Sequence, residues 1–271
     1  MKYTADQKKL RVFIINLSDH KEKKIRMKKI LKKFDIKYEF FNAFDGRNSS
    51  LNDYDGYNDL LRRLFLGRSL FPGELGAFES NRLLMKKIIN EDIKMALILE
   101  DDIEFEADFD EYLSKIIRTD YKWEVVRFIA RKKILNLKGR KVIELDNKTC
   151  LMRFPKLLGE THAYLISNDG AKKMLVATRN FYHQFDILMG QTWKTNLNCL
   201  YCVPGLVSQV PELNIIAKNH PRFQKKKKNI FSIYFFTRFF FKIYESIAKW
   251  IHYFYFLFHD LYHLNKFKKI K

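Results

Sequence analysis

Short apolar runs alternate with helix-like amphipathic stretches over the first 210 residues. Val12–Leu17 (V-F-I-I-N-L) is almost wholly apolar, which predicts a strand covered on both faces. From about Lys21 to Phe34, apolar residues recur at helical spacing among lysines, which predicts a helix, and Tyr38–Phe41 predicts a second strand. Later elements are expected as a helix beginning at Gly73–Gly76, strands near Val125–Ile129, Ala163–Ile166 and Leu197–Val203, and a helix near Asp169–Ala177. Alternating strands and helices predict an α/β domain with a largely parallel sheet over residues 1–215.

Clustered carboxylates end one of these apolar runs. The segment Met95–Phe105 is apolar until it reaches Glu100, Asp101 and Asp102. Alternation along a strand would place Glu100 and Asp102 on one face and Asp101 on the other. Two carboxylates at this spacing can bind a hard divalent cation such as Mg²⁺ or Mn²⁺. An acidic loop that only ends the strand is the alternative, and Asp102 with Glu104 is a competing pair.

Length and charge narrow the kinds of partner. A chain of 271 residues can bury one sizeable core and carry an appendage. The formal net charge of +20 predicts an anionic partner, which could be nucleic acid, anionic lipid or a phosphorylated substrate.

The C-terminal segment 221–271 differs from the rest of the chain. It contains 12 Lys and Arg against two acidic residues, and 17 of its 51 residues are aromatic. On a helical projection its polar residues form one narrow stripe, made of Arg238, Lys242, Glu245, Lys249, His252, His259, Asp260 and His263. This pattern predicts a basic amphipathic helix that associates with an anionic membrane surface, with Lys225–Lys228 as a basic collar. The alternative is a helix packed on its own domain. Nucleic acid is not expected, because wide apolar faces suit phosphate backbones poorly.

The cysteines and the N-terminus bear on the compartment. Cys199 and Cys202 form a C-x-x-C pair inside an apolar, strand-like run, and the third cysteine is Cys150. Small buried hydrophobic residues are the expected role, with redox or metal chemistry as the alternative. The N-terminus lacks a signal-like apolar stretch, and no uncharged run reaches the roughly 18 residues that span a bilayer. We therefore expect a cytoplasmic protein that is peripheral on the inner face of the membrane.

Seven segments in register resemble glycosyltransferase family 25, the lipopolysaccharide and lipooligosaccharide glycosyltransferases related to collagen galactosyltransferase domains. They are V-F-I-I-N-L at Val12–Leu17, F-F-N-A-F-D-G-R at Phe40–Arg47, P-G-E-L-G-A-F at Pro72–Phe78, L-I-L-E-D-D at Leu97–Asp102, T-H-A-Y-L-I-S at Thr161–Ser167, F-D-I-L at Phe185–Leu188 and V-P-G-L-V-S-Q at Val203–Gln209. Two departures from the family pattern are Ser80-Asn81, where Ser-His is usual, and Gln184 before Phe185-Asp186, where Pro is usual.

The resemblance implies a single GT-A-like domain, a nucleotide-sugar donor and usually a metal. Asp102 and Glu100 would then bind Mn²⁺ or Mg²⁺ between the protein and the donor diphosphate. Candidate donor-binding residues lie at the end of the first strand, on the next helix, in the Asp-Gly turn and beside the metal pair: Asn16, Leu17, Arg26, Asp45, Gly46 and Asp101. A solvated helix face is the alternative for Arg26, and a simple turn is the alternative for Asp45-Gly46.

The expected reaction is the transfer of a hexose, most simply galactose from UDP-galactose and otherwise glucose, to a lipid-linked oligosaccharide of lipooligosaccharide or lipopolysaccharide. An inverting transfer needs a general base for the acceptor hydroxyl. Asp186 is the candidate at the family's position, and Glu74, at a helix start, is the second. His162 is a further polar candidate, with a structural role as its alternative. The rival interpretation is a non-catalytic, membrane-associated protein of the same fold that binds glycans or assembly partners.

Overall fold

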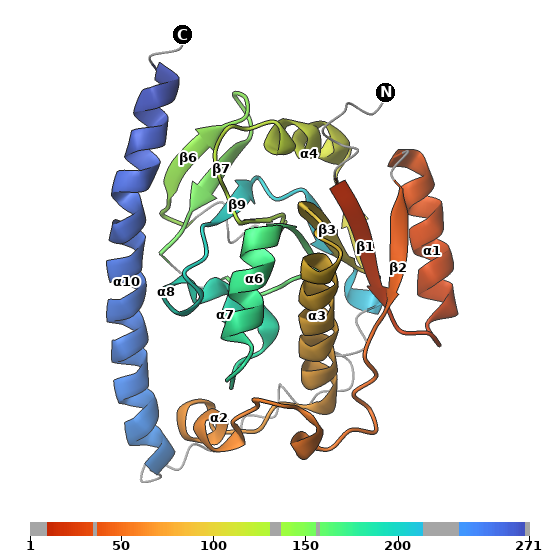
Figure 1. Cartoon of the computed structure of the whole chain (residues 1–271), viewed down its shortest axis with the longest axis vertical. Helices are drawn as coiled ribbons and strands as arrows, with labels where there is room; N and C mark the ends of the chain where they lie inside the picture. The colour runs from red at the N-terminus through yellow and green to blue at the C-terminus, as the bar shows by residue number, and fades with distance from the viewer. Residues whose placement is uncertain (1–9, 35–36, 131–136, 156–157, 214–232, 269–271) are drawn as a thin grey trace.

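A large mixed β-sheet with helices on both faces forms the centre of the molecule (Figure 1). The computed structural model describes residues 10–34, 37–130, 137–155, 158–213 and 233–268. Within these ranges, one sheet has the spatial order β2-β1-β3-β8-β5-β9-β7-β6. Its strands are β1 (Leu10–Asn16), β2 (Tyr38–Asn42), β3 (Met95–Glu100), β5 (Val125–Arg127), β6 (Arg140–Glu144), β7 (Cys150–Arg153), β8 (Ala163–Ser167) and β9 (Cys199–Val203).

Strand pairing fixes the directions within this sheet. Strands β2, β1, β3, β5, β9 and β6 run one way, and only β8 and β7 run the other way. The predicted class, α/β with a mostly parallel central sheet, is therefore confirmed.

The helices complete two apolar layers against the sheet. They are α1 (Lys21–Leu31), α2 (Asp59–Leu66), α3 (Pro72–Asn90), α4 (Phe109–Ile117), α6 (Asn168–Ala177), α7 (Phe185–Gly190), α8 (Thr192–Thr195) and α10 (Ile233–Lys268). One buried cluster joins alternate residues of β1 and β3, such as Phe13 and Ile98, to α3, α6 and α7. The other joins the intervening residues, such as Ile14 and Leu97, to α1 and α4. Burial on both faces explains why these strands are almost wholly apolar in sequence.

Most predicted elements are confirmed near their expected positions. The first helix, expected to run to Phe34, ends at Leu31 and continues as a 3₁₀ turn at Lys32–Phe34. Ser167 caps α6, as its side chain accepts a hydrogen bond from Gly170 N at 3.1 Å. The pattern did not predict α2, α4, α7, α8 or the β6–β7 hairpin. Cys199 and Cys202 are buried on β9, and all three cysteines are free thiols, as expected for small core residues.

A short antiparallel ribbon places one loop beside the acidic end of β3. Strand β4 (Ile103–Phe105) pairs with β10 (Val207–Gln209), and Gln209 lies opposite Ile103. Val210 N also donates to Asp102 O at 2.8 Å. The ribbon therefore brings Gln209, which is more than 100 residues away in sequence, to the carboxylates.

The last helix, α10, lies along the outside of the domain (Figure 1). It packs against α2, α8 and β6. The helix predicted within 221–271 is present. It packs on its own domain, as the alternative interpretation of this segment expected. The predicted basic collar, Lys225–Lys228, lies outside the described residues. Among the described residues, no helix combines the length and apolar character needed to cross a bilayer.

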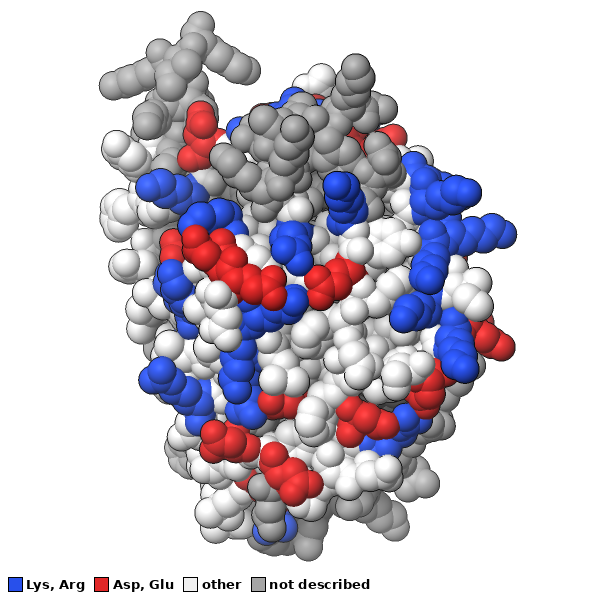
Figure 2. Space-filling model, turned by 45° about the vertical axis from the view of Figure 1, so that its right-hand side comes forward, with Lys and Arg blue, Asp and Glu red and all other residues white. Residues whose placement is uncertain are grey.

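Positive charge is distributed over the surface. On the face shown in Figure 2, lysines and arginines form several separate groups, with acidic side chains between them. This face of the described residues therefore presents mixed charge instead of one continuous basic groove.

Candidate active site

A pocket of about 440 Å³ opens at the carboxyl ends of β1 and β3. All seven segments that carry the family resemblance contribute to its lining. Of the predicted site residues, the pocket brings together Leu17, Asp45, Gly46, Glu74, Glu100, Asp101, Asp102 and Asp186. Asn16 and Arg26 are not part of the lining.

Glu100 and Asp102 point toward a shared partner in the pocket. Strand β3 ends at Glu100, and Asp101–Asp102 form a turn, so strand alternation does not extend to Asp102. The two carboxylates nevertheless converge, because Gln209 Nε2 lies 3.4 Å from Glu100 Oε2 and 3.3 Å from both Asp102 carboxylate oxygens. The pairing expected from alternation is found, but the turn and the ribbon produce it.

Asp101 faces a different set of partners at the end of β1. Its Oδ2 accepts a hydrogen bond from Asn16 Nδ2 at 2.8 Å, and its Oδ1 accepts one from Lys23 Nζ at 2.8 Å. Lys23 Nζ is also 3.7 Å from Asp102 Oδ2, and His20 Nδ1 is 3.7 Å from Asp101 Oδ2. Asp101 therefore orients Asn16 and Lys23.

Glu104, the alternative partner of Asp102, lies outside the pocket lining. Its side chain is 63% exposed and pairs with Arg26 Nη2 at 3.0 Å. Arg26 Nη1 donates to Ile103 O at 2.8 Å. These contacts hold Arg26 against the β4 ribbon instead of pointing it at a bound phosphate, and the geometry favours Glu100 as the partner of Asp102.

The electrostatics of the carboxylate pair are unusual. Burial, followed by the charges of Asp102 and Asp101, raises the pKa of Glu100 to about 8. Burial likewise raises the pKa of Asp102, although Lys23 acts in the opposite direction. In their ionised forms, three carboxylates against the one ammonium of Lys23 leave two uncompensated negative charges in this corner.

These residues fit a hard divalent cation. A nearby cation would favour the ionised forms of these two converging carboxylates, whose pKa values are raised mainly by burial. Oxygen ligands are also those that Mg²⁺ and Mn²⁺ prefer. No cluster of three or more His, Cys, Asp or Glu suited to a metal occurs among the described residues. Glu100 and Asp102 are the two residues that would hold such an ion.

The Asp-Gly turn forms another wall of the pocket. Asp45 accepts hydrogen bonds from Arg47 Nε at 2.8 and 3.0 Å, and Arg47 Nη1 donates to Asp19 Oδ2 at 2.7 Å. Hydrogen bonds from Arg47 lower the pKa of Asp45 to about 2. Gly46 packs so closely on α3 that a Cβ atom there would lie 2.2 Å from Pro72 O. The absence of a side chain therefore serves the contact with α3, in addition to any approach by a ligand.

The two candidate bases differ in how they are held. The buried Glu74 receives Arg68 Nη1 and Nη2, each at 2.8 Å, along with Phe71 N at 3.0 Å and Gln184 Nε2 at 2.7 Å. Asp186, at the start of α7, accepts from Glu160 N and Ile187 N, both at 2.8 Å. A carboxylate clamped by a bidentate arginine is a poor proton acceptor, which counts against Glu74 as a base.

Several polar residues of the pocket were not among the sequence candidates. Lys23 and His20 come from the start of α1, and Gln209 comes from β10. The unusual Gln184 also lines the pocket, where it bonds Glu74. Gln209 ended a family segment and could have been selected on that basis, but Lys23 is one of many lysines in α1 and had no distinguishing signal. His162, weighed as a polar candidate, lines the pocket and is buried, with Nε2 3.0 Å from Val207 O.

The fold and this site define a class: an α/β protein with a carboxylate-bearing pocket at the carboxyl edge of its sheet. Residues 9–189 match the model of Glycosyltransferase family 25 (LPS biosynthesis protein). The chain belongs to this family, as its seven segments predicted. Family membership and the observed sheet agree with the GT-A-like fold expected from the sequence.

Similar proteins include both named transferases and inactive members. Procollagen galactosyltransferase 2 from Homo sapiens is 28% identical over 174 residues, which cover 61% of this chain and 27% of that protein. Inactive glycosyltransferase 25 family member 3 from Homo sapiens is 25% identical over 183 residues, covering 61% and 28%. This chain thus spans less than a third of the length of either relative.

A solved structure is also similar. It is a glycosyltransferase involved in the glycosylation of the major capsid of PBCV-1, with a TM-score of 0.41, 7% identity and coverage of 74% of this chain and 92% of that one.

Proposed function

We propose that this protein transfers a hexose from a nucleotide sugar to a lipid-linked oligosaccharide, with galactose from UDP-galactose as the first candidate and glucose as the second. The observation that carries this proposal is the convergence of all seven family segments on one pocket that holds Glu100 and Asp102. The family description, LPS biosynthesis protein, supports a lipid-linked acceptor, and the galactosyltransferase named among the relatives supports galactose.

Each pocket wall has a proposed task. Glu100 and Asp102 hold Mn²⁺ or Mg²⁺, which when bound neutralises charge on the departing nucleoside diphosphate. Lys23 adds a cation on the same side, and Asp101 keeps it in place through the 2.8 Å contact. Leu17, Asp45 and Gly46 line the donor side of the pocket.

Asp186 is the proposed general base of an inverting transfer. Its carboxylate is oriented by two backbone N–H groups and takes the proton from the acceptor hydroxyl as that oxygen attacks the anomeric carbon. Glu74, clamped by Arg68, would instead hold the start of α3 and Gln184 in position.

A non-catalytic role is the second candidate. It is favoured by the inactive family members among the similar proteins. In that case the pocket would bind a glycan or nucleotide without turnover.

A donor screen separates the two candidates. Purified protein is incubated with UDP-galactose, UDP-glucose and other nucleotide sugars, with and without Mn²⁺, while nucleotide release and donor binding are measured. We expect metal-dependent nucleotide release that is fastest with one of the two UDP-hexoses. Binding without release would support the non-catalytic role, and the absence of both binding and release would contradict the proposal.

A further inference from the structure

Most of the described polar stripe of α10 faces the domain: Asp260 is buried, and Arg238, Glu245, Lys249 and His252 are half-buried, whereas Lys242 and His259 are exposed. Glu245 Oε1 accepts from Gln191 Nε2 at 2.6 Å, and His252 Nδ1 lies 3.0 Å from Thr192 Oγ1. Thr237 donates to Leu64 O of α2. Soluble domains usually turn the apolar side of a surface helix inward, so α10 has the reverse arrangement.

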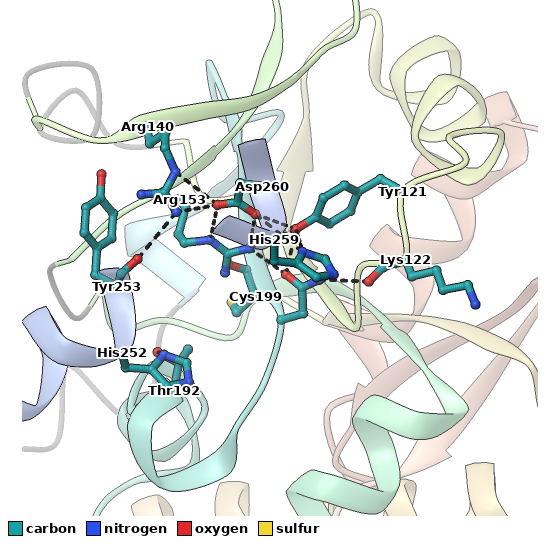
Figure 3. Close-up of polar contacts among 11 residues, drawn as sticks. Tyr121, Lys122, Arg140, Arg153, Thr192, Cys199, His252, Tyr253, His259 and Asp260 are labelled. Carbon is teal, nitrogen blue, oxygen red and sulfur yellow. Dashed lines mark hydrogen bonds and ion pairs between the residues drawn. The ribbon is translucent and has the colours of Figure 1, made fainter. Parts of the chain in front are cut away.

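Asp260 fixes this orientation at the C-terminal half of the helix (Figure 3). It is fully buried, and its carboxylate accepts from Arg153 Nε and Nη2, both at 2.9 Å, and from Tyr121 Oη at 2.7 Å. Arg140 Nε adds a contact at 3.1 Å. Burial alone would raise the pKa of Asp260, but the hydrogen bonds and charge of Arg153, with Arg140 and Tyr121, hold it below its usual range. Because the buried carboxylate of Asp260 lies between the guanidinium groups of Arg153 and Arg140, it fixes the rotation of α10 about its own axis.

Two aromatic contacts add apolar packing on the same inward side. Phe241 stacks on Phe65 of α2 with ring centroids 4.5 Å apart, and Arg153 lies over the ring of Phe256 at 4.1 Å. Phe241 and Phe256, the two phenylalanines of α10 in these contacts, are buried.

The outward side of α10 is therefore mostly apolar over residues 233–262, where Lys242 is an exposed cation. Of the 19 large hydrophobic residues exposed among the described residues, 15 belong to this helix. They recur every three or four residues: Ile233, Phe235, Phe236, Phe239, Phe240, Ile243, Tyr244, Ile247, Trp250, Ile251, Phe254, Tyr255, Phe258, Leu261 and Tyr262. A helix of 36 residues is about 54 Å long, so this face is far larger than the scattered apolar residues of an ordinary surface.

Charge decides between the possible occupants of this face. A second copy would bring another chain of formal charge +20 against the first, whereas an anionic bilayer complements that charge. The face also mixes Trp and Tyr with Phe and Ile, a composition that suits the headgroup boundary.

We propose that the outward face of α10 binds an anionic bilayer, with the helix lying flat and the domain held rigidly against the surface by the buried polar side. The binding does not depend on the proposed sugar transfer. The consequence of membrane binding for the active site does depend on the proposed sugar transfer. Helix α10 packs on α2, and the segment after α2 carries Arg68, which donates hydrogen bonds to Glu74 in the pocket wall. Membrane binding would thus hold the pocket near acceptors displayed by the same membrane.

Sedimentation with vesicles of equimolar phosphatidylcholine and phosphatidylglycerol tests the proposal on the full chain. The variant replaces three outward residues, Phe240→Ser, Ile251→Ser and Phe258→Ser, which are 66%, 66% and 79% exposed. The matched control replaces three equally exposed hydrophobic residues elsewhere, Ile25→Ser, Leu60→Ser and Val176→Ser. We expect the wild type and the control to sediment with vesicles and the α10 variant to bind on the order of 100-fold more weakly.

Equal binding by the α10 variant and the wild type would overturn the proposal, as would the absence of vesicle binding by the wild type. The molar mass in solution, measured by light scattering without lipid, provides a further check. A wild-type dimer that the α10 variant converts to monomer, without vesicle binding, would assign the face to a second copy instead. Donor binding measured in parallel separates this result from the proposed function, because it should be the same in all three proteins.

Discussion

At the scale of single residues, two histidines at the interface between α10 and the domain have lowered pKa values: His183, which is buried, and His252, which is on α10 itself and half-buried. Burial, followed by Lys194 and Arg62, lowers the pKa of His183 to about 3. Burial, followed by Arg153 and Lys173, lowers the pKa of His252 to about 4. Both imidazoles are therefore neutral in the folded protein at neutral pH, and protonating either one means placing a cation beside existing cations.

The expected result is a loss of stability in mild acid. Because these pKa values lie below the ordinary 6.5, the unfolded chain takes up protons first as the pH falls from about 6.5 to 4. His183 should lower the free energy of unfolding by roughly 3 kcal/mol across this range, and His252, which solvent partly screens, should add a smaller loss. Urea unfolding at several pH values measures this change in the free energy of unfolding.

The raised pKa of Glu100 acts in the opposite direction over part of this range, so the test is a comparison of slopes. The variant His252→Gln should flatten the dependence on pH relative to the wild type. An unchanged slope in His252→Gln would show that this imidazole does not titrate as described.

Residue identity at the acidic cluster could be predicted from sequence, but its geometry could not. Glu100 and Asp102 stood out because an apolar strand ended in carboxylates. Their convergence depends on a turn and on Gln209, which the β4–β10 ribbon delivers from more than 100 residues away. Long-range pairing of this kind leaves no local pattern, and for the same reason the contacts of Lys23 were not predicted.

At the scale of elements, α10 shows what an amphipathic pattern leaves open. The phasing correctly identified one narrow polar stripe, but period alone does not say which side faces the protein. The choice is made by partners in other elements, among them Arg140 on β6 and Arg153 on β7. Strands β1 and β3 had no such ambiguity, because continuous apolar runs require cover on both faces.

Replacing Asp260 with Asn tests whether the buried carboxylate holds α10 in place. The substitution keeps the shape but leaves two guanidinium groups without their anion, and we expect a loss of about 3 kcal/mol in unfolding free energy. The matched control is Asp169→Asn on α6, whose side chain is 79% exposed, and it should change stability by less than about 0.5 kcal/mol. Chemical denaturation of both variants gives the comparison, and equal stabilities would contradict the role of Asp260.

Removing the whole helix is a less informative experiment. It would expose Phe65 on α2 and leave Arg140 and Arg153 without Asp260, so the domain itself would lose stability. Substitutions on the outward face separate membrane binding from folding, since those side chains extend from the domain.

At the scale of the whole molecule, one pocket collects residues from segments spread over about 200 positions. Strand ends of β1 and β3, the start of α3, the start of α7 and the β10 ribbon each supply one wall. Family membership says that these segments belong together, and the fold explains how, because carboxyl ends of neighbouring parallel strands meet at one edge. The proposed membrane contact of α10 would hold this pocket near a membrane-displayed acceptor.

The central claim is that the paired carboxylates of this pocket support sugar transfer through a divalent cation. The most direct measurement is the initial rate of hexose transfer against Mn²⁺ concentration for the wild type, Asp102→Asn and Glu104→Gln, using the donor found in the screen. Glu104 is the matched control, because it is an acid two residues away that lies outside the pocket.

We predict that Asp102→Asn loses on the order of 100-fold or more in rate while its circular dichroism and unfolding midpoint match the wild type. Glu104→Gln should keep the wild-type rate and metal dependence. A folded Asp102→Asn protein with the wild-type rate would contradict the account.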